Sequence, residues 1–208
     1  MIKHLIFDFD GTISDSYPMF VQVVKEVAGE FGVPVVHSDE ELSDMLRVNT
    51  KYCMDQMGIN HPSAVRGKVF WKYQRVHSLE FKAFDEIEPI LKKSLSLGKK
   101  NYIYTHTGDV VHDMLKNMGL HHYFAGIVTA ANGFPPKPAP DALRYLCKTY
   151  GLDPAECLMI GDRDIDTKAG NNAGTKGCLW DAYDRYSDYQ TDYKIKTLSE
   201  LYELLDRI

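Results

Sequence analysis

A short apolar run near the start of the chain, Leu5–Phe7, is followed at once by Asp8, Phe9, Asp10 and Gly11. An apolar run of this length is typical of a strand that is buried on both faces of a parallel sheet. In such a sheet ligands bind at the carboxyl ends of the strands, so we expect both aspartates to lie at the edge of a site. Two carboxylates in one place repel each other unless a cation or a proton separates them.

The pair Asp8 and Asp10 therefore suits two kinds of chemistry. A hard divalent cation prefers oxygen ligands of this type. The two carboxylates can also divide the work of a reaction, with one as nucleophile and the other as acid and base. The alternative is a hairpin turn at Asp10-Gly11. We favour the functional interpretation, because the segment that follows has a helical pattern.

Beyond residue 84, short apolar runs alternate with helical patterns, most of which end at a glycine. Strands are expected at 102–104, 127–128, 158–160 and 177–180, and helices at 87–97, 110–118, 141–150, 167–173 and 198–205. This alternation predicts an α/β fold, a Rossmann-like and mostly parallel sheet with helices on both faces. The stretch 181–193 is rich in Asp and Tyr without a clear period, and we expect a loop there.

Residues 15–84 have a different character, with helical patterns and no convincing strand. Pro18 marks the start of a first helix, Ser38–Glu41 forms a capping box for a second, and a later helix is expected over 63–81. We therefore predict an α-helical cap domain at 15–84, inserted into an α/β core domain made of 1–14 and 85–208.

Composition narrows the class of protein. The chain has 208 residues, 44% of them apolar, which is enough for a real core, and a net charge of −5. This charge gives no basic footprint for nucleic acid, and no apolar run approaches the roughly 18 residues of a membrane span. The cysteines form no C-x-x-C pair, so reduced thiols and a cytoplasmic protein are expected; they are Cys53, Cys147, Cys157 and Cys178.

Further polar residues follow the expected strands. Thr105 could hold an anionic oxygen beside a helix N-terminus, or simply cap that helix. Lys137 lies between prolines that fix its backbone, although most lysines are solvated. Asp162 ends a strand, and Asp166 lies one helical turn later. Acids, a hydroxyl and a lysine at one sheet edge are the groups that phosphoryl transfer through an aspartyl phosphate requires.

Taken in order, four segments resemble the four motifs of the haloacid dehalogenase superfamily: Asp8–Thr12, Thr105, Lys137–Pro138 and Gly161–Asp166. The helical block resembles the C1-type cap of the phosphoglycolate phosphatase-like and β-phosphoglucomutase-like branch. The resemblance covers essentially the whole chain. It implies an Mg²⁺-dependent phosphatase that acts on a small phosphate ester.

The resemblance also implies roles for single residues. Asp8 would attack phosphorus, and Asp10 would protonate the leaving alcohol and then activate water. Mg²⁺ would be bound by Asp8, by the backbone carbonyl of Asp10 and by Asp162, with Asp166 supporting the metal or the lysine from outside. The phosphate oxygens would be held by Thr105 and Lys137.

At two positions the roles stay open. His106 stands where relatives often have Asn, and it would either contact the substrate phosphate or be a buried, satisfied histidine. Arg47 follows the second cap helix, and would either clamp a second anionic group of the substrate or be a solvated residue at a helix C-terminus.

Three other functions remain open from the sequence. A phosphosugar mutase keeps the same acids. A phosphonatase-like enzyme would use a cap lysine as a Schiff base. A non-catalytic phosphate-binding scaffold would gain nothing from clustered, repelling carboxylates, so we favour an enzyme.

Overall fold

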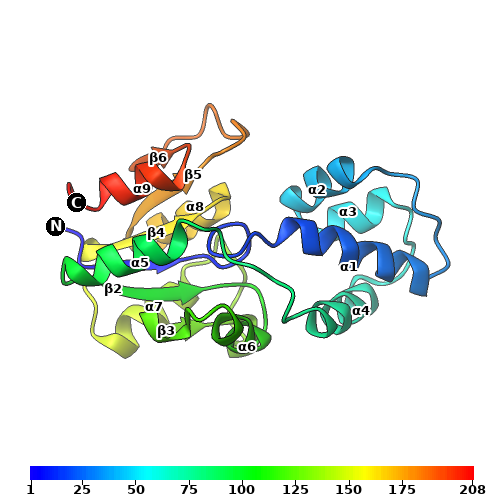
Figure 1. The fold of residues 1–208 in the computed structure, drawn as a ribbon, viewed down its shortest axis with the longest axis horizontal. Helices are drawn as coiled ribbons and strands as arrows, with labels where there is room; N and C mark the ends of the chain where they lie inside the picture. The colour runs from blue at the N-terminus through cyan, green and yellow to red at the C-terminus, as the bar shows by residue number, and fades with distance from the viewer. The chain divides into compact units, whose positions relative to one another are not determined.

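The computed structural model describes all 208 residues and divides into two compact units. We call Met1–Ser14 together with Ala83–Ile208 the α/β unit, and Asp15–Lys82 the helical unit. The chain passes from the α/β unit into the helical unit shortly after the first strand and returns just before the fifth long helix (Figure 1).

The α/β unit is built on a six-stranded sheet with the order β3-β2-β1-β4-β5-β6, in which all neighbours are parallel (Figure 1). The strands are β1 (His4–Phe7), β2 (Lys100–Tyr104), β3 (Phe124–Val128), β4 (Cys157–Gly161), β5 (Lys176–Trp180) and β6 (Tyr193–Ile195). Strands β1 and β4, at the centre, are mostly apolar and buried because both faces of the sheet are covered. The prediction of an α/β fold with a parallel sheet is confirmed.

Register places the ends of the central strands side by side. Phe7 pairs with Ile103 of β2 and with Ile160 of β4. The residues that follow these three positions therefore emerge together at the carboxyl edge of the sheet, which is where an open α/β sheet binds its ligands.

Helices pack on the sheet in two groups, α5 beside α9 and α7 beside α8 (Figure 1). Crossover connections between parallel strands are right-handed. A helix that connects to the next strand on one side of the sheet therefore lies on the opposite face from a helix that connects to a strand on the other side. Their bounds are α5 (Ile87–Ser96), α6 (Val110–Asn117), α7 (Asp141–Tyr150), α8 (Asp164–Ala173) and α9 (Leu198–Leu204), with short 3-10 turns η1 (His121–Tyr123), η2 (Ala130–Asn132) and η3 (Pro154–Glu156).

The helical unit contains four helices, in which α1 contacts both α2 and α4, and α3 contacts α2. They are α1 (Tyr17–Glu30), α2 (Asp39–Val48), α3 (Thr50–Gln56) and α4 (Ser63–Val76). The predicted capping box begins α2, since the Ser38 hydroxyl accepts from the Glu41 N–H and the Glu41 carboxylate accepts from the Ser38 N–H. No strand is found in this unit.

Three expectations about element bounds were wrong. Strand β6 begins at Tyr193, at the end of the expected loop, and is too short to show a period. Helix α8 begins at Asp164 instead of residue 167, because acidic side chains in its first turn suit the positive end of the helix dipole. Helix α4 ends at Val76 instead of residue 81.

The tyrosine-rich stretch between β5 and β6 is folded onto the α/β unit. The Asp181 carboxylate accepts hydrogen bonds from the backbone N–H groups of Arg185 (2.8 Å) and Tyr186 (3.1 Å). The Thr167 hydroxyl, on α8, donates to the Tyr189 hydroxyl at 2.9 Å. Helix α8 is thereby supported from the side of this stretch.

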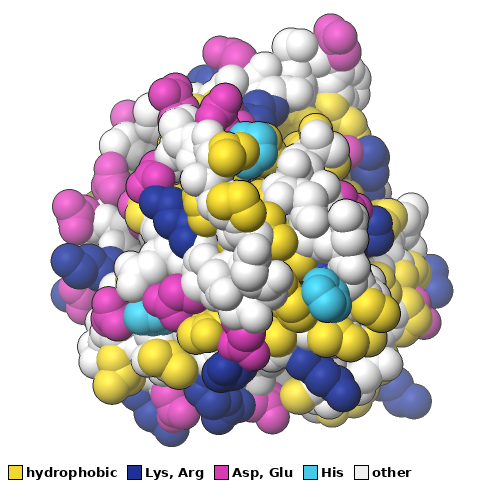
Figure 2. Space-filling view, turned by 90° about the vertical axis from the view of Figure 1, so that its right-hand side faces the viewer, with side chains coloured by type: hydrophobic (Ala, Val, Ile, Leu, Met, Phe, Trp, Pro, Cys, Tyr) yellow, Lys and Arg dark blue, Asp and Glu magenta, His cyan; other side chains and the backbone are white.

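The helices of the structure are all too short or too polar to span a bilayer. On the face of the molecule shown in Figure 2, acidic and basic side chains are interspersed, and neither sign forms a continuous patch.

Candidate active site

Asp8 lies directly after β1 and is 8% exposed. Its backbone N–H donates to the Ile160 carbonyl at 2.8 Å, so the chain leaves the sheet in line with β4. The following residues turn sharply, with the N–H groups of Ile13 and Ser14 both donating to the Phe9 carbonyl at 2.9 Å. Gly11 has φ +77° in this turn, a conformation that favours glycine.

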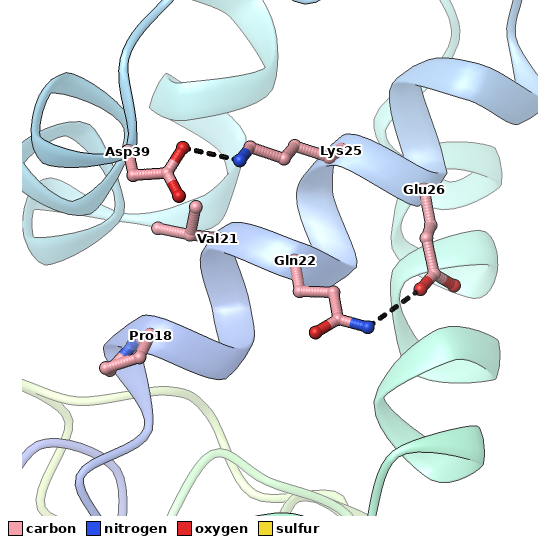
Figure 3. A pocket seen from close by; sticks show the side chains of 6 residues that line it. All are labelled: Pro18, Val21, Gln22, Lys25, Glu26 and Asp39. Atoms are coloured by element: carbon pink, nitrogen blue, oxygen red, sulfur yellow. Dashed lines mark hydrogen bonds and ion pairs between the residues drawn. The ribbon is translucent and has the colours of Figure 1, made fainter.

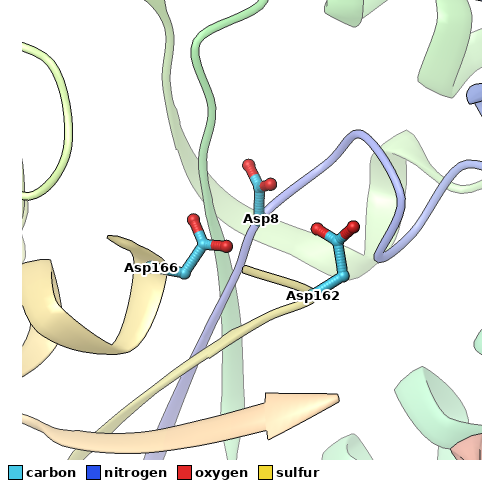
Figure 4. A group of neighbouring side chains, drawn as sticks. All are labelled: Asp8, Asp162 and Asp166. Carbon is cyan, nitrogen blue, oxygen red and sulfur yellow. The ribbon is translucent and has the colours of Figure 1, made fainter. Parts of the chain in front are cut away.

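Three carboxylates converge at the carboxyl edge of the sheet (Figure 4). One oxygen each from Asp8, Asp162 and Asp166 lie within 4.8 Å of one another. Mg²⁺ binds oxygen at about 2.0–2.1 Å in octahedral geometry, so its ligand oxygens are about 2.9 Å apart when adjacent and about 4.2 Å apart when opposite, and the carboxylates would move closer together to share one ion. The donor set of this site therefore fits a hard divalent cation. The Asp10 carboxylate is not part of the group.

Lys137 forms ion pairs with two of these carboxylates, those of Asp8 and Asp166. Its Nζ donates to Asp8 Oδ1 and to Asp166 Oδ1, both at 2.7 Å, and it also lies 4.6 Å from the centre of the Tyr104 ring. Burial by itself would lower the pKa of Lys137, but the two carboxylates outweigh it and raise that pKa above its ordinary value. The ammonium is therefore charged, and it partly neutralises the acidic cluster.

Asp166 has a partner on each oxygen and is 1% exposed. Oδ1 accepts from Lys137, and Oδ2 accepts from the Arg163 backbone N–H at 3.1 Å, at the start of α8. Gly161 makes room for it, because a Cβ at this position would lie 2.3 Å from the Asp166 carboxyl carbon. Only glycine is tolerated at the end of β4 without moving Asp166.

The turn after β2 brings three successive polar side chains to this edge. Thr105 is 1% exposed, and its hydroxyl accepts from the Thr107 N–H at 3.0 Å. His106 Nε2 accepts from the backbone N–H of Lys137 at 2.9 Å. Burial, aided by the charge of Lys137, lowers the pKa of His106 to about 4, so the ring is neutral at pH 7.

The position of His106 matters for its role. An Nε2 that accepts a hydrogen bond cannot donate to a phosphate, so the proton of the neutral ring is on Nδ1. Of the two predicted roles, the buried and satisfied histidine agrees with this contact. The nitrogen seen here holds the backbone of Lys137.

Asp10 lies apart from the three-carboxylate group and has a partner that the sequence analysis did not single out. The Thr107 hydroxyl donates to Asp10 Oδ2 at 2.5 Å. Thr107 stands two residues beyond Thr105 in the same turn, and a hydroxyl this close to a predicted phosphate ligand is the signal that was available in the sequence.

Arg47 belongs to the helical unit, in the last turn of α2. Its guanidinium lies 4.0 Å from the centre of the Tyr17 ring. Burial raises the pKa of nearby Asp15, and the charge of Arg47 opposes that rise. The arginine therefore has a defined position on an aromatic ring within its own unit.

A groove on the helical unit is lined by Pro18, Val21, Gln22, Lys25, Glu26 and Asp39 (Figure 3). Its polar side chains satisfy one another: Lys25 pairs with Asp39, and Gln22 donates to Glu26 at 3.4 Å. The charged side chains of the Lys25–Asp39 pair in this groove are 38% and 74% exposed, whereas those at the edge of the sheet are buried. The edge of the sheet is therefore the candidate active site.

Comparison with known proteins identifies the family to which this fold belongs. The family model described as haloacid dehalogenase-like hydrolase matches residues 5–180, and the chain belongs to this family. It is a hydrolase of that family, and the resemblance inferred from the motifs is confirmed.

Several relatives span nearly the whole chain. A pyrophosphatase PpaX of Bacillus velezensis is 26% identical over 96% of this chain and 94% of its own length. A phosphoglycolate phosphatase of Aquifex aeolicus is 26% identical over 99% and 97%. The crystal structure of a predicted phosphatase from Clostridium acetobutylicum superposes with a TM-score of 0.85 over 100% of both chains, at 20% identity.

Proposed function

We propose that this protein is an Mg²⁺-dependent phosphatase that hydrolyses a small phosphomonoester through an aspartyl-phosphate intermediate. The observation that carries the proposal is the buried cluster at the carboxyl edge of the sheet, where Lys137 bonds both Asp8 and Asp166 while Asp162 faces them. Buried charges are costly to maintain, and clusters of this kind occur at functional sites.

In the first half of the reaction, an oxygen of Asp8 attacks phosphorus. The P–O bond to the alcohol breaks, and its electron pair goes to the leaving oxygen. Asp10 donates its proton to that oxygen, so a neutral alcohol departs. Lys137 and the Thr105 hydroxyl hold the phosphate oxygens in place.

In the second half, Asp10 is a carboxylate and takes a proton from a water molecule. That water attacks phosphorus, and the P–O bond to Asp8 breaks. Asp8 returns to a carboxylate, Asp10 regains its proton, and inorganic phosphate is released.

The metal would be held by Asp8, Asp162 and the backbone carbonyl of Asp10, with Asp166 supporting Lys137. When bound, Mg²⁺ supplies charge neutralisation for the phosphate oxygens. His106 would act indirectly, by fixing the backbone of Lys137.

Small phosphate compounds are the proposed substrates because the relatives are named for them. Those names include a fructose-1-phosphate phosphatase of Escherichia coli, 26% identical over 82% of this chain, and the phosphoglycolate phosphatase described above. We further propose that residues 15–84, which include the helical unit, form a cap that contributes substrate contacts, Arg47 among them.

The test is release of inorganic phosphate from a panel of phosphate esters, measured with Mg²⁺ and in excess chelator. We expect release only with Mg²⁺, restored when the metal is added back, and poor activity with Ca²⁺, which prefers larger and less regular coordination. Unchanged release in excess chelator would overturn the metal requirement. A sugar phosphate that is isomerised without phosphate release would point to a mutase, and no conversion of any ester would overturn the enzyme.

A further inference from the structure

Thr107 joins the turn after β2 to the turn after β1. Its hydroxyl donates to Asp10 Oδ2 at 2.5 Å, and the residue is 2% exposed. A short hydrogen bond to a carboxylate is among the stronger ones in a protein, and this bond is partly buried. In the proposed reaction its partner Asp10 donates a proton in the first half and accepts one in the second.

The backbone of Thr107 is fixed on both sides. Its N–H donates to the Thr105 hydroxyl at 3.0 Å, and its carbonyl accepts from the Ala130 N–H at 3.1 Å. Thr105 follows β2 and Ala130 follows β3. The hydroxyl is therefore placed by the ends of two strands, which are the rigid part of the unit, and precise placement of this kind is what a catalytic acid requires.

We propose that Thr107 is a positioning residue that orients the carboxyl group of Asp10 for proton transfer. The inference rests on the proposed function, in which Asp10 is the acid and base. A threonine hydroxyl has one proton, and here it is given to Asp10 Oδ2. In the acid form the carboxyl proton is then carried on Oδ1.

This assignment fixes which atom acts in each step. As the P–O bond to the alcohol breaks, the proton leaves Asp10 Oδ1 and bonds to the leaving oxygen, which keeps the electron pair. In the second step Oδ1 takes a proton from the attacking water. Thr107 itself exchanges no proton with the substrate and keeps its hydrogen bond to Oδ2 throughout.

Loss of the hydroxyl should therefore matter most where the leaving group needs a proton. An alkyl phosphate expels an alkoxide, which is a poor leaving group unless it is protonated. 4-Nitrophenyl phosphate expels a stabilised phenolate, which leaves without help. Because kcat/KM reports the steps up to the first irreversible one, the ratio of kcat/KM for the two substrates measures how well Asp10 acts as an acid.

The experiment compares Thr107→Val, which keeps the shape of the side chain, with Thr107→Ser, which keeps the hydroxyl. For Thr107→Val we expect kcat/KM for an alkyl phosphate such as glycerol phosphate to fall by about ten-fold to a hundred-fold, a part of the full effect of an acid. For 4-nitrophenyl phosphate the fall should be under about threefold. Thr107→Ser should restore most of the loss.

A matched control is available in Thr129, which is 4% exposed and donates its hydroxyl to Asp109 Oδ1 at 2.7 Å. Thr129→Val also removes a threonine–aspartate hydrogen bond in the same unit, although its acceptor Asp109 is exposed, and it should leave the ratio of the two substrates unchanged. Equal losses on both substrates in Thr107→Val, or no loss on either, would overturn the positioning role. These outcomes require an active wild-type enzyme, so they are distinct from failure of the phosphatase proposal, in which the wild type itself releases no phosphate.

Discussion

In the α/β unit, Lys137 is paired with Asp8 and Asp166, and all three side chains are at most 12% exposed. In the helical unit, the pair Lys72 and Glu30 has side chains that are 57% and 35% exposed. The first set joins residues from three distant parts of the chain. The second joins the surfaces of two neighbouring helices and is surrounded by water.

The two sets differ in what they contribute. An exposed ion pair adds about 0–1 kcal/mol and is easily lost or replaced. A buried set loses hydration, and a packed apolar cluster would often stabilise the fold as well or better. The presence of such a buried set therefore indicates chemistry more than stability.

The largest loss of activity is expected from Asp8→Asn, which changes the buried cluster. We expect turnover to fall by more than about a thousand-fold, because an amide cannot replace a carboxylate as the nucleophile. The fold should survive, since Lys137 keeps Asp166 as a partner, and the free energy of unfolding without metal should change by no more than about 1 kcal/mol. Steady-state kinetics and denaturant unfolding measure the two effects.

The matched control for Asp8→Asn is Asp164→Asn, which removes a charge from a pair with Lys168 on the first turn of α8, whose side chains are 25% and 45% exposed. That variant should keep nearly full activity. An Asp8→Asn enzyme with more than a few per cent of the wild-type rate would remove Asp8 from the nucleophile role.

The sequence predicted the parts of the site that depend on strand ends. A buried strand followed by acids implies the sheet edge, so the sequence alone places Asp8 and Asp162 near each other. Chain order and spacing then supplied the family. Parallel register explains the success, because the ends of β1, β2 and β4 lie level in the sheet.

The side-chain partners within the site could not be predicted in the same way. Whether His106 meets phosphate or Lys137, and whether Thr107 meets Asp10, depends on the path of a turn and on side-chain rotamers. Neither has a periodic signal in the sequence. Strand β6 was not predicted either, because three residues are too few to show alternation.

His106, which holds the backbone of Lys137, should make the free energy of unfolding depend on pH. The pKa of His106 is lowered to about 4, mainly by burial, against about 6.5 in an unfolded chain. Between these values only the unfolded chain takes up a proton. The stability contributed by the neutral ring is therefore present above pH 6.5 and is lost as the pH falls toward 4.

At pH 4.5 the loss from His106 should be about 2.5 kcal/mol relative to pH 7.5. His106→Gln keeps an acceptor for the Lys137 N–H but cannot be protonated, so it should lose less stability over this range. Denaturant unfolding at both pH values gives the comparison, and His122→Gln, at an exposed histidine, is the control. Equal pH dependence in His106→Gln and the wild type would mean that His106 is not held neutral.

The smallest effect is expected from a substitution in the helical unit, at Arg47, which tests whether this arginine contacts the substrate. Arg47 stacks on Tyr17, which is 5% exposed, and cation–π contacts contribute about 0.5–2 kcal/mol, more when they are less exposed. If its guanidinium also meets a second anion of the substrate, Arg47→Ala should lower kcat/KM for 2-phosphoglycolate about tenfold, or about 1.4 kcal/mol. The rate with 4-nitrophenyl phosphate should hardly change.

Arg75→Ala is the control for Arg47→Ala, because it removes an exposed arginine from the last turn of α4 in the same unit. It should leave both substrates unaffected. Equal losses on the two substrates in Arg47→Ala would assign Arg47 to the folding of the helical unit, since a purely structural defect does not distinguish leaving groups. No loss on either would return it to the class of solvated charges that Lys72 and Glu30 represent. A loss confined to the two-anion substrate would instead mean that Arg47, although it belongs to the helical unit, acts in substrate selection. Arg47 would then differ from exposed charges of that unit such as Lys72 and Glu30.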